Sequence, residues 1–309
     1  MNKSIMIWDE KVAQDYVSWE NSETGQFVLA RKKSLLLSIC APWLTRKASV
    51  LEVGCGTGYF LQVLQEAGLD VTGVDFSPPM LNRARGRVGS RADLHLGNAE
   101  YLQFETNGYD YVLLLNVLEF CRNPGDALEE AFRIAKKGVL VNFLNRHSCY
   151  YLARRLGGHP RCSLDILYAK AHYWSWPEMR RFLNLKIGQY PIKFGSVLPG
   201  PPCTWKDKTF CRSLNSRIYP LPWGAQCVAR LTFCRKIPLT PIFAWKREPQ
   251  LHYPKTNTLT SDCLDIPSCP AGIRIRPSAW SMVFNNPDFP IKGTAVGKPS
   301  SENSRRTRT

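Results

Sequence analysis

Between about residues 47 and 145, short apolar runs alternate with stretches whose apolar residues recur at helical spacing. Val50–Val53 is an apolar run of strand length, and Phe60, Val63, Leu64 and Ala67 then follow the i, i+3, i+4, i+7 spacing of one helix face. Strands that alternate with helices predict βαβ units, and therefore an α/β fold with a parallel sheet covered on both faces. The pattern predicts strands at residues 50–53, 71–75, 93–96, 109–115 and 138–143, and helices at residues 60–67, 79–87 and 124–135.

The flanking segments complete the predicted architecture. Two further strands, at residues 186–197 and 225–233, would extend the sheet to a doubly wound, seven-stranded and mostly parallel one. Pro, Ser, Thr and Asn dominate the C-terminal segment, where periodicity is lost, so we expect it to be disordered. The expected parts are an N-terminal helical cap at residues 1–45, a main domain at residues 46–247 with an inserted lid at residues 146–185, and a tail at residues 248–309.

Composition indicates which binding partners and which cellular compartment to expect. The 309 residues include 41 Lys and Arg against 25 Asp and Glu, a formal net charge of +16 that attracts anions such as nucleic acid. The 11 cysteines form no C-x-x-C pair and their number is odd, so we expect no disulfide framework and no metal site. The sequence shows no signal peptide and no apolar run near the roughly 18 residues of a membrane span, so we expect a cytoplasmic protein without a transmembrane segment. The oligomeric state is not indicated.

The most informative motif is LEVGCGTG at residues 51–58, where an apolar strand ends in Glu52 and three alternating glycines lead into an amphipathic helix. Gly54, Gly56 and Gly58 allow a tight turn and the close approach of a ligand that a Cβ would exclude. Cys55 is interpreted as a small filler of this loop and not as a nucleophile. The motif predicts a ligand site at the end of the first strand, with a glycine-rich turn that binds nothing as the alternative.

Polar residues also stand at the ends of the next strands. Asp75 closes the second strand, where its carboxylate can accept hydrogen bonds from both ribose hydroxyls of a nucleoside. Asn98 and Ala99 follow the third strand, and Asn116 ends the fourth. Because the carboxyl ends of parallel strands share one edge of the sheet, these positions predict a single nucleoside site there.

A nicotinamide cofactor is the obvious rival for such a site. Its G-x-G-x-x-G fingerprint requires the third glycine at position 59, but Tyr59 stands there and the glycine falls at Gly58. The carboxylate of Glu52 would also repel a pyrophosphate, whereas it can orient an ammonium group. The loop therefore favours a nucleoside cofactor without phosphates.

With these motifs the chain resembles the class I S-adenosylmethionine-dependent methyltransferases, in particular the type 11-like small-molecule group that includes menaquinone and ubiquinone biosynthesis enzymes. The resemblance covers about residues 15–233 and implies a Rossmann-like fold, S-adenosylmethionine as cofactor and methyltransferase activity. The stretches that carry it are LEVGCGTGYF, VTGVDFSPPMLNRAR, LHLGNAEYLQF, YDYVLLLNVLEFCRNPGDALEEAFRIAKKGVLV and LPWGAQCVARLTF.

The resemblance also implies roles for particular residues. The glycine loop would hold the methionine part of the cofactor, Asp75 the ribose, Phe76 the adenine ring, and Asn98 with Ala99 the adenine amino group. Two positions depart from the family: Asn98 stands where Asp is usual, and Gly138 is the remainder of a glycine pair before the fifth strand. The predicted cofactor-binding residues are Glu52, Gly54, Cys55, Gly56, Gly58, Asp75, Phe76, Asn98, Ala99 and Asn116.

Methyl transfer from a sulfonium is an in-line displacement, in which holding the two reactants together can supply about 7 to 11 kcal/mol, so a general base is optional. The candidates for such a base follow the fourth and fifth strands: Asn116, Glu119 and His147, with His159 and His172 farther along. The catalytic residue itself is not predicted.

Aromatic and basic residues are interleaved in the expected lid. They allow three interpretations: the hydrophobic core of the lid, a pocket for a flat or apolar substrate, or a stacking surface for nucleic acid. Tyr173 and Trp174 are the predicted substrate-binding residues. The predicted function is methyl transfer from S-adenosylmethionine to a small or medium-sized acceptor, with an RNA methyltransferase or a catalytically silent cofactor-binding protein as alternatives.

Overall fold

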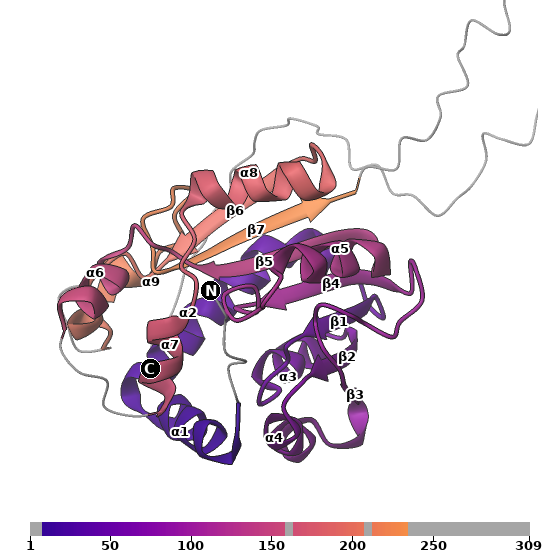
Figure 1. The fold of residues 1–309 in the computed structure, drawn as a ribbon, viewed down its shortest axis with the longest axis horizontal. Helices are drawn as coiled ribbons and strands as arrows, with labels where there is room; N and C mark the ends of the chain where they lie inside the picture. Colours follow the sequence, from indigo (N-terminus) through magenta and orange to yellow (C-terminus); the bar gives the residue numbers. More distant parts are fainter. Residues whose placement is uncertain (1–7, 158–162, 207–211, 234–309) are drawn as a thin grey trace, which may run out of the picture. The chain divides into compact units, whose positions relative to one another are not determined.

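The computed structural model describes residues 8–157, 163–206 and 212–233, which form a seven-stranded sheet with helices on both faces (Figure 1). The strands are β1 (Ser49–Val53), β2 (Asp70–Asp75), β3 (Asp93–Leu96), β4 (Tyr109–Leu115), β5 (Ala135–Leu144), β6 (Ile192–Val197) and β7 (Gln226–Thr232). Their order across the sheet is β3-β2-β1-β4-β5-β7-β6. The pairs from β3 to β5 are parallel, and β7 runs antiparallel to both β5 and β6. The predicted seven-stranded, mostly parallel sheet is confirmed.

The helices cover the two faces of this sheet and one of its edges. They are α1 (Glu10–Asn21), α2 (Glu23–Cys40), α3 (Tyr59–Glu66), α4 (Pro78–Val88), α5 (Pro124–Ile134), α6 (Cys149–Leu156), α7 (Ser163–Lys170), α8 (Trp176–Ile187) and α9 (Arg212–Ser216), with the 3-10 turns η1 (Ala41–Trp43), η2 (Gly89–Arg91) and η3 (Pro202–Thr204).

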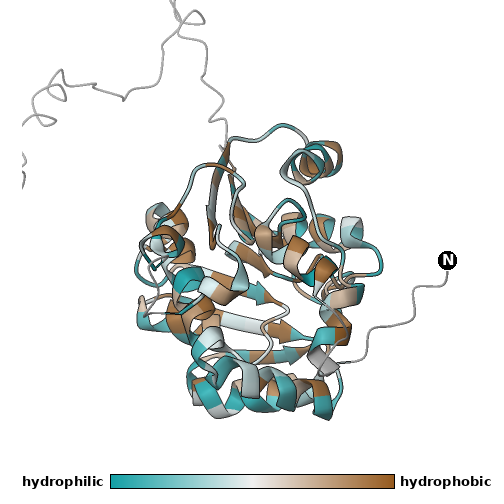
Figure 2. Cartoon of the chain, turned by 90° about the vertical axis from the view of Figure 1, so that its left-hand side faces the viewer, coloured by the Kyte–Doolittle hydropathy of each residue, from teal (hydrophilic) through white to brown (hydrophobic). Residues whose placement is uncertain are grey.

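Strand β4 shows how the alternation of side chains builds two cores. Tyr111, Leu113 and Leu115 join the cluster formed with α2, α3 and α4, whereas Val112 and Leu114 join the cluster on the opposite face with α5 and α8. This period of two is that of a strand buried on both faces. Figure 2 shows the corresponding alternation of hydrophobic and hydrophilic segments along the covering helices.

The N-terminal helices meet at a tight corner. Ser22 ends α1 and caps α2, where its hydroxyl accepts a hydrogen bond from the backbone N–H of Gly25 at 3.0 Å. A Cβ on Gly25 would lie 1.8 Å from the carbonyl oxygen of Trp19, so the corner requires a residue without a side chain. The predicted helical cap therefore consists of two helices that pack in different places. Helix α1 packs against α4 and α7, whereas α2 packs on β6 and β7 as part of the core.

The expected lid divides into two parts. A capping box of Ser175 and Glu178 opens α8, which buries Met179 and Leu183 in the core and packs against α5. Because α8 continues to Ile187, β6 begins at residue 192 and not at the predicted residue 186. Helices α6 and α7 form the other part of residues 146–185, and they lie near the carboxyl ends of the parallel strands.

The predicted disordered tail, residues 248–309, lies outside the described residues. Within the described ranges, no helix has the length and apolar character needed to cross a membrane. The same ranges contain no group of His, Cys, Asp and Glu side chains arranged to hold a metal ion.

Candidate active site

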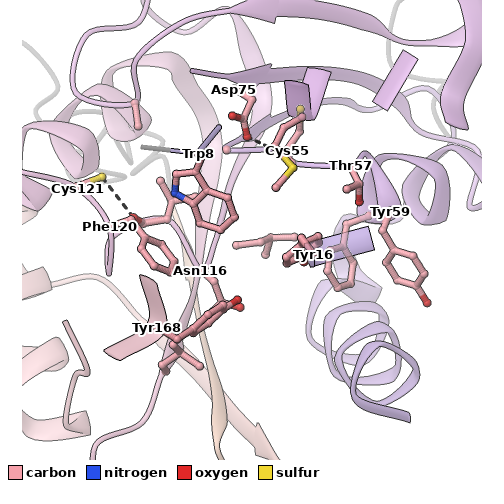
Figure 3. A pocket seen from close by; sticks show the side chains of 18 of the residues that line it. Trp8, Tyr16, Cys55, Thr57, Tyr59, Asp75, Asn116, Phe120, Cys121 and Tyr168 are labelled. Atoms are coloured by element: carbon pink, nitrogen blue, oxygen red, sulfur yellow. Dashed lines mark hydrogen bonds between the residues drawn. The ribbon is translucent and has the colours of Figure 1, made fainter. Parts of the chain in front are cut away.

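A cavity of about 990 Å³ opens at the carboxyl ends of the parallel strands. Its walls come from the glycine loop after β1, the ends of β2, β3 and β4, and the helices α1, α2, α6 and α7. Figure 3 shows side chains from these elements around one space, with Asp75 and Cys55 on one side and Tyr168 on another. This is the place at which open α/β sheets bind ligands, as the strand-end residues predicted.

Glycine is required at the three positions of the loop for different structural reasons. All adopt positive φ angles, of +68° at Gly54, +55° at Gly56 and +75° at Gly58. A Cβ on Gly54 would lie 2.5 Å from Val117 Cγ2, and one on Gly58 would lie 3.1 Å from Ala84 Cβ. A Cβ on Gly56 would meet no protein atom within 4 Å, because Gly56 faces the cavity. Gly58 is absent from the described cavity lining, so it shapes the turn, while Gly56 leaves room for a ligand.

Substitution by alanine should separate these two roles. Both changes carry the strain of a left-handed residue, about 1 to 2 kcal/mol, and Gly58→Ala adds the contact with Ala84. We expect Gly58→Ala to lower the melting temperature more than Gly56→Ala does. In contrast, Gly56→Ala should weaken S-adenosylhomocysteine binding more, because its new Cβ projects into the cavity. Thermal melts and calorimetric titrations of both variants measure this, and a reversed order would contradict the assignment.

Asp75 is nearly buried at the end of β2 and lines the cavity. Its Oδ2 accepts a hydrogen bond from the backbone N–H of Gly56 at 2.8 Å, and its Oδ1 accepts one from the backbone N–H of Ser77 at 2.9 Å. Burial raises the pKa of this carboxyl, and the backbone hydrogen bonds of Ser77, Gly56 and Phe76 oppose that rise. Each carboxylate oxygen keeps a lone pair, so Asp75 can fix the glycine loop and accept from ligand hydroxyls at the same time.

Two groups of opposite charge face the cavity near the glycine loop. Glu52 is buried, and its Oε2 has no hydrogen-bond partner among the described residues. Burial raises its pKa to about 8, with Lys32 opposing the rise. Lys32 comes from α2, and the enclosure of its amino group lowers its pKa to about 8 against the attraction of Glu119, Glu52 and Glu20. An incoming group with separated positive and negative charges would relieve the desolvation of both.

Asn116 and Glu119 form a hydrogen-bonded chain with Lys32. The amino group of Lys32 donates to Asn116 Oδ1 at 2.7 Å, and Asn116 Nδ2 donates to Glu119 Oε1 at 3.0 Å. The same Glu119 oxygen accepts the backbone N–H of Leu144 at 2.7 Å. Glu119 is fully buried, its pKa is raised to about 7 by burial, and it is not among the described lining residues. Its position is therefore that of a residue that orients Asn116, which itself lines the cavity.

Most of the predicted cofactor-binding residues converge on the cavity. Phe76 is about half exposed there, and Asn98 uses its Oδ1 to accept the backbone N–H of Glu100 at 3.0 Å. Burial raises the pKa of the Cys55 thiol, in keeping with its interpretation as a filler. The predicted residues that line the cavity are Glu52, Gly54, Cys55, Gly56, Asp75, Phe76, Asn98, Ala99 and Asn116.

Other predicted residues lie elsewhere. Tyr173 is buried against Tyr150 and Tyr151, and Trp174 is buried in the core beside Phe182, so neither belongs to the described lining. The backbone N–H of Trp174 donates to the Leu144 carbonyl, which fixes this segment beside the end of β5.

His147 and His172 are also absent from the described lining. His147 is exposed, and its backbone N–H donates to Asn145 Oδ1. His172 contacts Glu178 at 3.1 Å. His159 lies outside the described residues. The geometry therefore leaves Asn116 as the candidate from strands four and five that faces the cavity.

The structure adds lining residues that sequence patterns did not single out. Trp8, Tyr16 and Trp19 reach the cavity from α1 and the residues before it, Lys32 comes from α2, and Gln226 from the start of β7. The spacing of Tyr16 and Trp19 by three residues was the available signal, since it places both rings on one face of a helix.

Known proteins are similar to this chain over part of its sequence. Residues 51–143 match the family model described as "Methyltransferase domain". The malonyl-[acyl-carrier protein] O-methyltransferase of Salmonella typhimurium is 34% identical over 96 residues, which are 31% of this chain and 38% of that protein. The ubiquinone biosynthesis O-methyltransferase of Aromatoleum aromaticum is 31% identical over 126 residues, 37% of this chain and 54% of that protein. The chain thus spans about half or less of the length of these relatives.

Solved structures extend the likeness to the whole fold. A S-adenosylmethionine-dependent methyltransferase of Thermotoga maritima, described as a possible histamine N-methyltransferase, superposes with a TM-score of 0.55 at 23% identity, over 72% of this chain and 97% of that one. Magnesium protoporphyrin IX methyltransferase of Synechocystis, solved with bound S-adenosylhomocysteine, superposes with a TM-score of 0.53 at 15% identity, over 72% of this chain and 95% of that one. At these identities the likeness concerns the fold.

Proposed function

We propose that this chain, a member of the class I S-adenosylmethionine-dependent methyltransferases by its domain at residues 51–143, transfers a methyl group from S-adenosylmethionine to a small or medium-sized acceptor. The observation that carries the proposal is the buried pair of an acidic and a basic side chain, Glu52 and Lys32, at the glycine loop. Glu52 has a buried oxygen without a partner among the described residues, and the amino group of Lys32 lies near it. A methionine end, with its ammonium and its carboxylate, satisfies both groups.

Other lining residues are suited to hold the ribose and the adenine of the cofactor. Asp75 would accept from the ribose hydroxyls, Phe76 would pack on the adenine ring, and Asn98 with Ala99 would border the adenine edge, since all four residues line the cavity. When bound, S-adenosylmethionine supplies an electrophilic methyl group on a sulfonium. This chain supplies the cradle, the exclusion of water by aromatic side chains, and the position of the acceptor relative to that group.

Asn116 is a polar side chain that lines the cavity directly after the end of β4. Its φ angle is +58°, a left-handed conformation that is strained for most residues and tolerated by Asn. The hydrogen bonds to Lys32 and Glu119 hold the side chain in place at the end of β4. We assign Asn116 to orienting the donor and acceptor groups, and Glu119 to positioning Asn116. The proton released by an acceptor hydroxyl or amine then leaves to solvent.

Transfer of label tests the proposed function. The protein is incubated with methyl-labelled S-adenosylmethionine and host extract, and label is then measured separately in small molecules, RNA and protein. We expect label in the small-molecule fraction, and much less of it with the Asp75→Ala variant when S-adenosylmethionine is kept below saturation. Label in RNA would replace the acceptor class with nucleic acid, and cofactor binding without transfer to any fraction would favour a silent binding protein.

The charge pair predicts a pH dependence of cofactor binding. In the free protein the pKa of Glu52 is about 8, so this carboxyl is mostly protonated at pH 6. Pairing with the ligand ammonium favours the carboxylate, so binding releases a proton and affinity must rise with pH below the free pKa. Lys32, with its pKa also about 8, stays mostly protonated over pH 6 to 7.5 and contributes little slope. We expect the Kd for S-adenosylhomocysteine to fall as pH rises from 6 to 7.5, by at most about tenfold per pH unit.

Two variants control this measurement. Glu52→Gln removes the titrating carboxyl and should abolish the slope, whereas Glu66→Gln, at the exposed end of α3, should keep it. Calorimetry in two buffers of different ionisation enthalpy counts the released proton directly. An unchanged slope in Glu52→Gln would show that another group binds the ammonium.

A further inference from the structure

The cavity continues beyond the half assigned to the cofactor, across the ends of β5 and β7. Leu144 at the end of β5 and Gln226 at the start of β7 line this second part. Neighbouring strands are about 4.8 Å apart, so β7, two strands beyond β4, lies about 10 Å farther along the sheet edge. A cavity of about 990 Å³ is at the upper end of the range for ligand pockets and can hold a second ligand beside a cofactor. We call this second part, lined by Leu144, Tyr150, Arg154, Tyr168, Trp205 and Gln226, the acceptor half.

Aromatic rings lead from the cofactor half into the acceptor half. Trp8 meets Phe120 edge to face with 5.3 Å between ring centroids, and Phe120 meets Tyr168 in the same way at 5.5 Å. All three rings line the cavity, as Figure 3 shows for their side chains. Helix α7, which carries Tyr168, packs against α1. Such surfaces bind flat rings by stacking and edge-to-face contacts.

A second aromatic group completes the wall. Tyr150 and Trp205 are stacked with ring centroids 5.3 Å apart. The Arg154 guanidinium lies 5.7 Å from the Tyr150 ring centroid and 5.9 Å from that of Tyr168, so it joins the two groups. Its charge is met by Asp165, with 3.2 Å between Arg154 Nη1 and Asp165 Oδ1. The wall therefore offers ring faces, with its carboxylate and its guanidinium already paired.

Gln226 is a polar residue at the floor of the acceptor half. It is 8% exposed and held between two strands, with Leu144 of β5 and Val197 of β6 as its ladder neighbours. Although it lines the cavity, its Oε1 has no hydrogen-bond partner among the described residues. A buried amide oxygen without a partner costs free energy, which a donor on a ligand would recover.

From the proposed function, on which this inference rests, and from these contacts we infer that the methyl acceptor is a planar aromatic compound with a hydrogen-bond donor on its ring, and that Gln226 is the residue that reads the donor. The ring lies among Phe120, Tyr168 and Tyr150, and its hydroxyl or amine donates to Gln226 Oε1. An aliphatic acceptor would leave both the ring faces and this oxygen unused. Gln226 is thus a specificity-determining residue, and aromatic acceptors without a donor are rejected.

Binding of a matched series of probes tests the inference without turnover. The dissociation constants of 2-naphthol, 2-methoxynaphthalene, 2-aminonaphthalene and decahydro-2-naphthol are measured on the full chain with and without S-adenosylhomocysteine. For the wild type we expect 2-naphthol or 2-aminonaphthalene to bind roughly 5- to 150-fold more tightly than 2-methoxynaphthalene, the range for leaving a buried acceptor unpaired. The saturated decahydro-2-naphthol should bind more weakly than 2-naphthol. The tighter of the two donor probes identifies the donor as a hydroxyl or an amine.

Substitutions then assign the preference to one residue. Gln226→Leu keeps the side-chain size and should bind 2-naphthol and 2-methoxynaphthalene equally, while Gln226→Glu keeps an acceptor oxygen and should retain the preference. Gln103→Leu makes the same change at an exposed position outside the cavity lining and should behave as the wild type. A thermal melt of each variant verifies its folding.

Three outcomes would overturn the inference: a donor preference that survives in Gln226→Leu, equal binding of the probes by the wild type, and tighter binding of the saturated probe. The proposed function fails separately, if S-adenosylhomocysteine does not bind. Donor-dependent naphthol binding that is lost in Gln226→Leu supports the role of Gln226 whether or not the cofactor binds.

Discussion

Replacing Asp75 with alanine is expected to weaken S-adenosylmethionine binding by about 2 to 3 kcal/mol, roughly 30- to 150-fold in Kd. The reason is twofold. The carboxylate is the acceptor assigned to the ribose hydroxyls, and its oxygens also hold the backbone N–H groups of Gly56 and Ser77 at 2.8 and 2.9 Å. Losing it therefore removes ligand contacts and loosens the glycine loop together. Calorimetric titration of the wild type and the variant measures the change.

The same strand offers a matched control. Asp70 is the exposed first residue of β2, at the end opposite to Asp75, so Asp70→Ala should bind the cofactor as the wild type does. If Asp75→Ala also retained full affinity, the ribose would have been assigned to the wrong residue.

Removing Glu20 should have the largest effect on stability. This buried carboxylate of α1 accepts from Thr57 Oγ1 at 2.6 Å and pairs with Arg87 Nη2 at 2.9 Å, so it ties α1 to both the glycine loop and α4. Breaking a fully buried pair costs about 3 to 5 kcal/mol, and Arg87 remains partly hydrated, so we expect about 2 to 3 kcal/mol for Glu20→Ala. The melting temperature should fall by roughly 5 to 10 °C.

A second ion pair of α1 provides the comparison. Glu10 pairs with Arg83 at 2.6 Å, also between α1 and α4, but its side chain is 73% exposed. Exposed pairs contribute little, so Glu10→Ala should leave the melting temperature almost unchanged. Equal effects of the two substitutions would show that Glu20 is not the anchor of α1. Because α1 carries Tyr16 and Trp19, Glu20→Ala should also weaken the binding of aromatic probes.

The sheet and its strand-end residues could be predicted from the sequence because their signals are local. The alternation that places Leu113 and Leu114 on opposite faces is written in consecutive residues, and glycine spacing identifies the loop after β1. Asp75 and Asn116 follow from the rule that parallel strands end at one edge. These inferences need no knowledge of which distant segments meet.

The rest of the site depends on contacts between distant segments. Lys32 reaches Asn116 across 84 positions of sequence, which no periodicity indicates. Tyr173 and Trp174 belong to the same aromatic run as Tyr168, yet the chain turns so that Tyr168 lines the cavity and the other two are buried beside it. The sequence left three interpretations of these aromatic residues open, because which rings face the cavity is decided by packing.

A calorimetric titration of the full chain with S-adenosylhomocysteine, S-adenosylmethionine and NAD at the same concentrations tests whether the cavity binds S-adenosylmethionine through the glycine loop and Asp75. We expect saturable binding of one molecule of either S-adenosyl compound per chain, strongly reduced in Asp75→Ala, and no binding of NAD. Binding of NAD, or binding of the S-adenosyl compounds that is unaffected by Asp75→Ala, would contradict it.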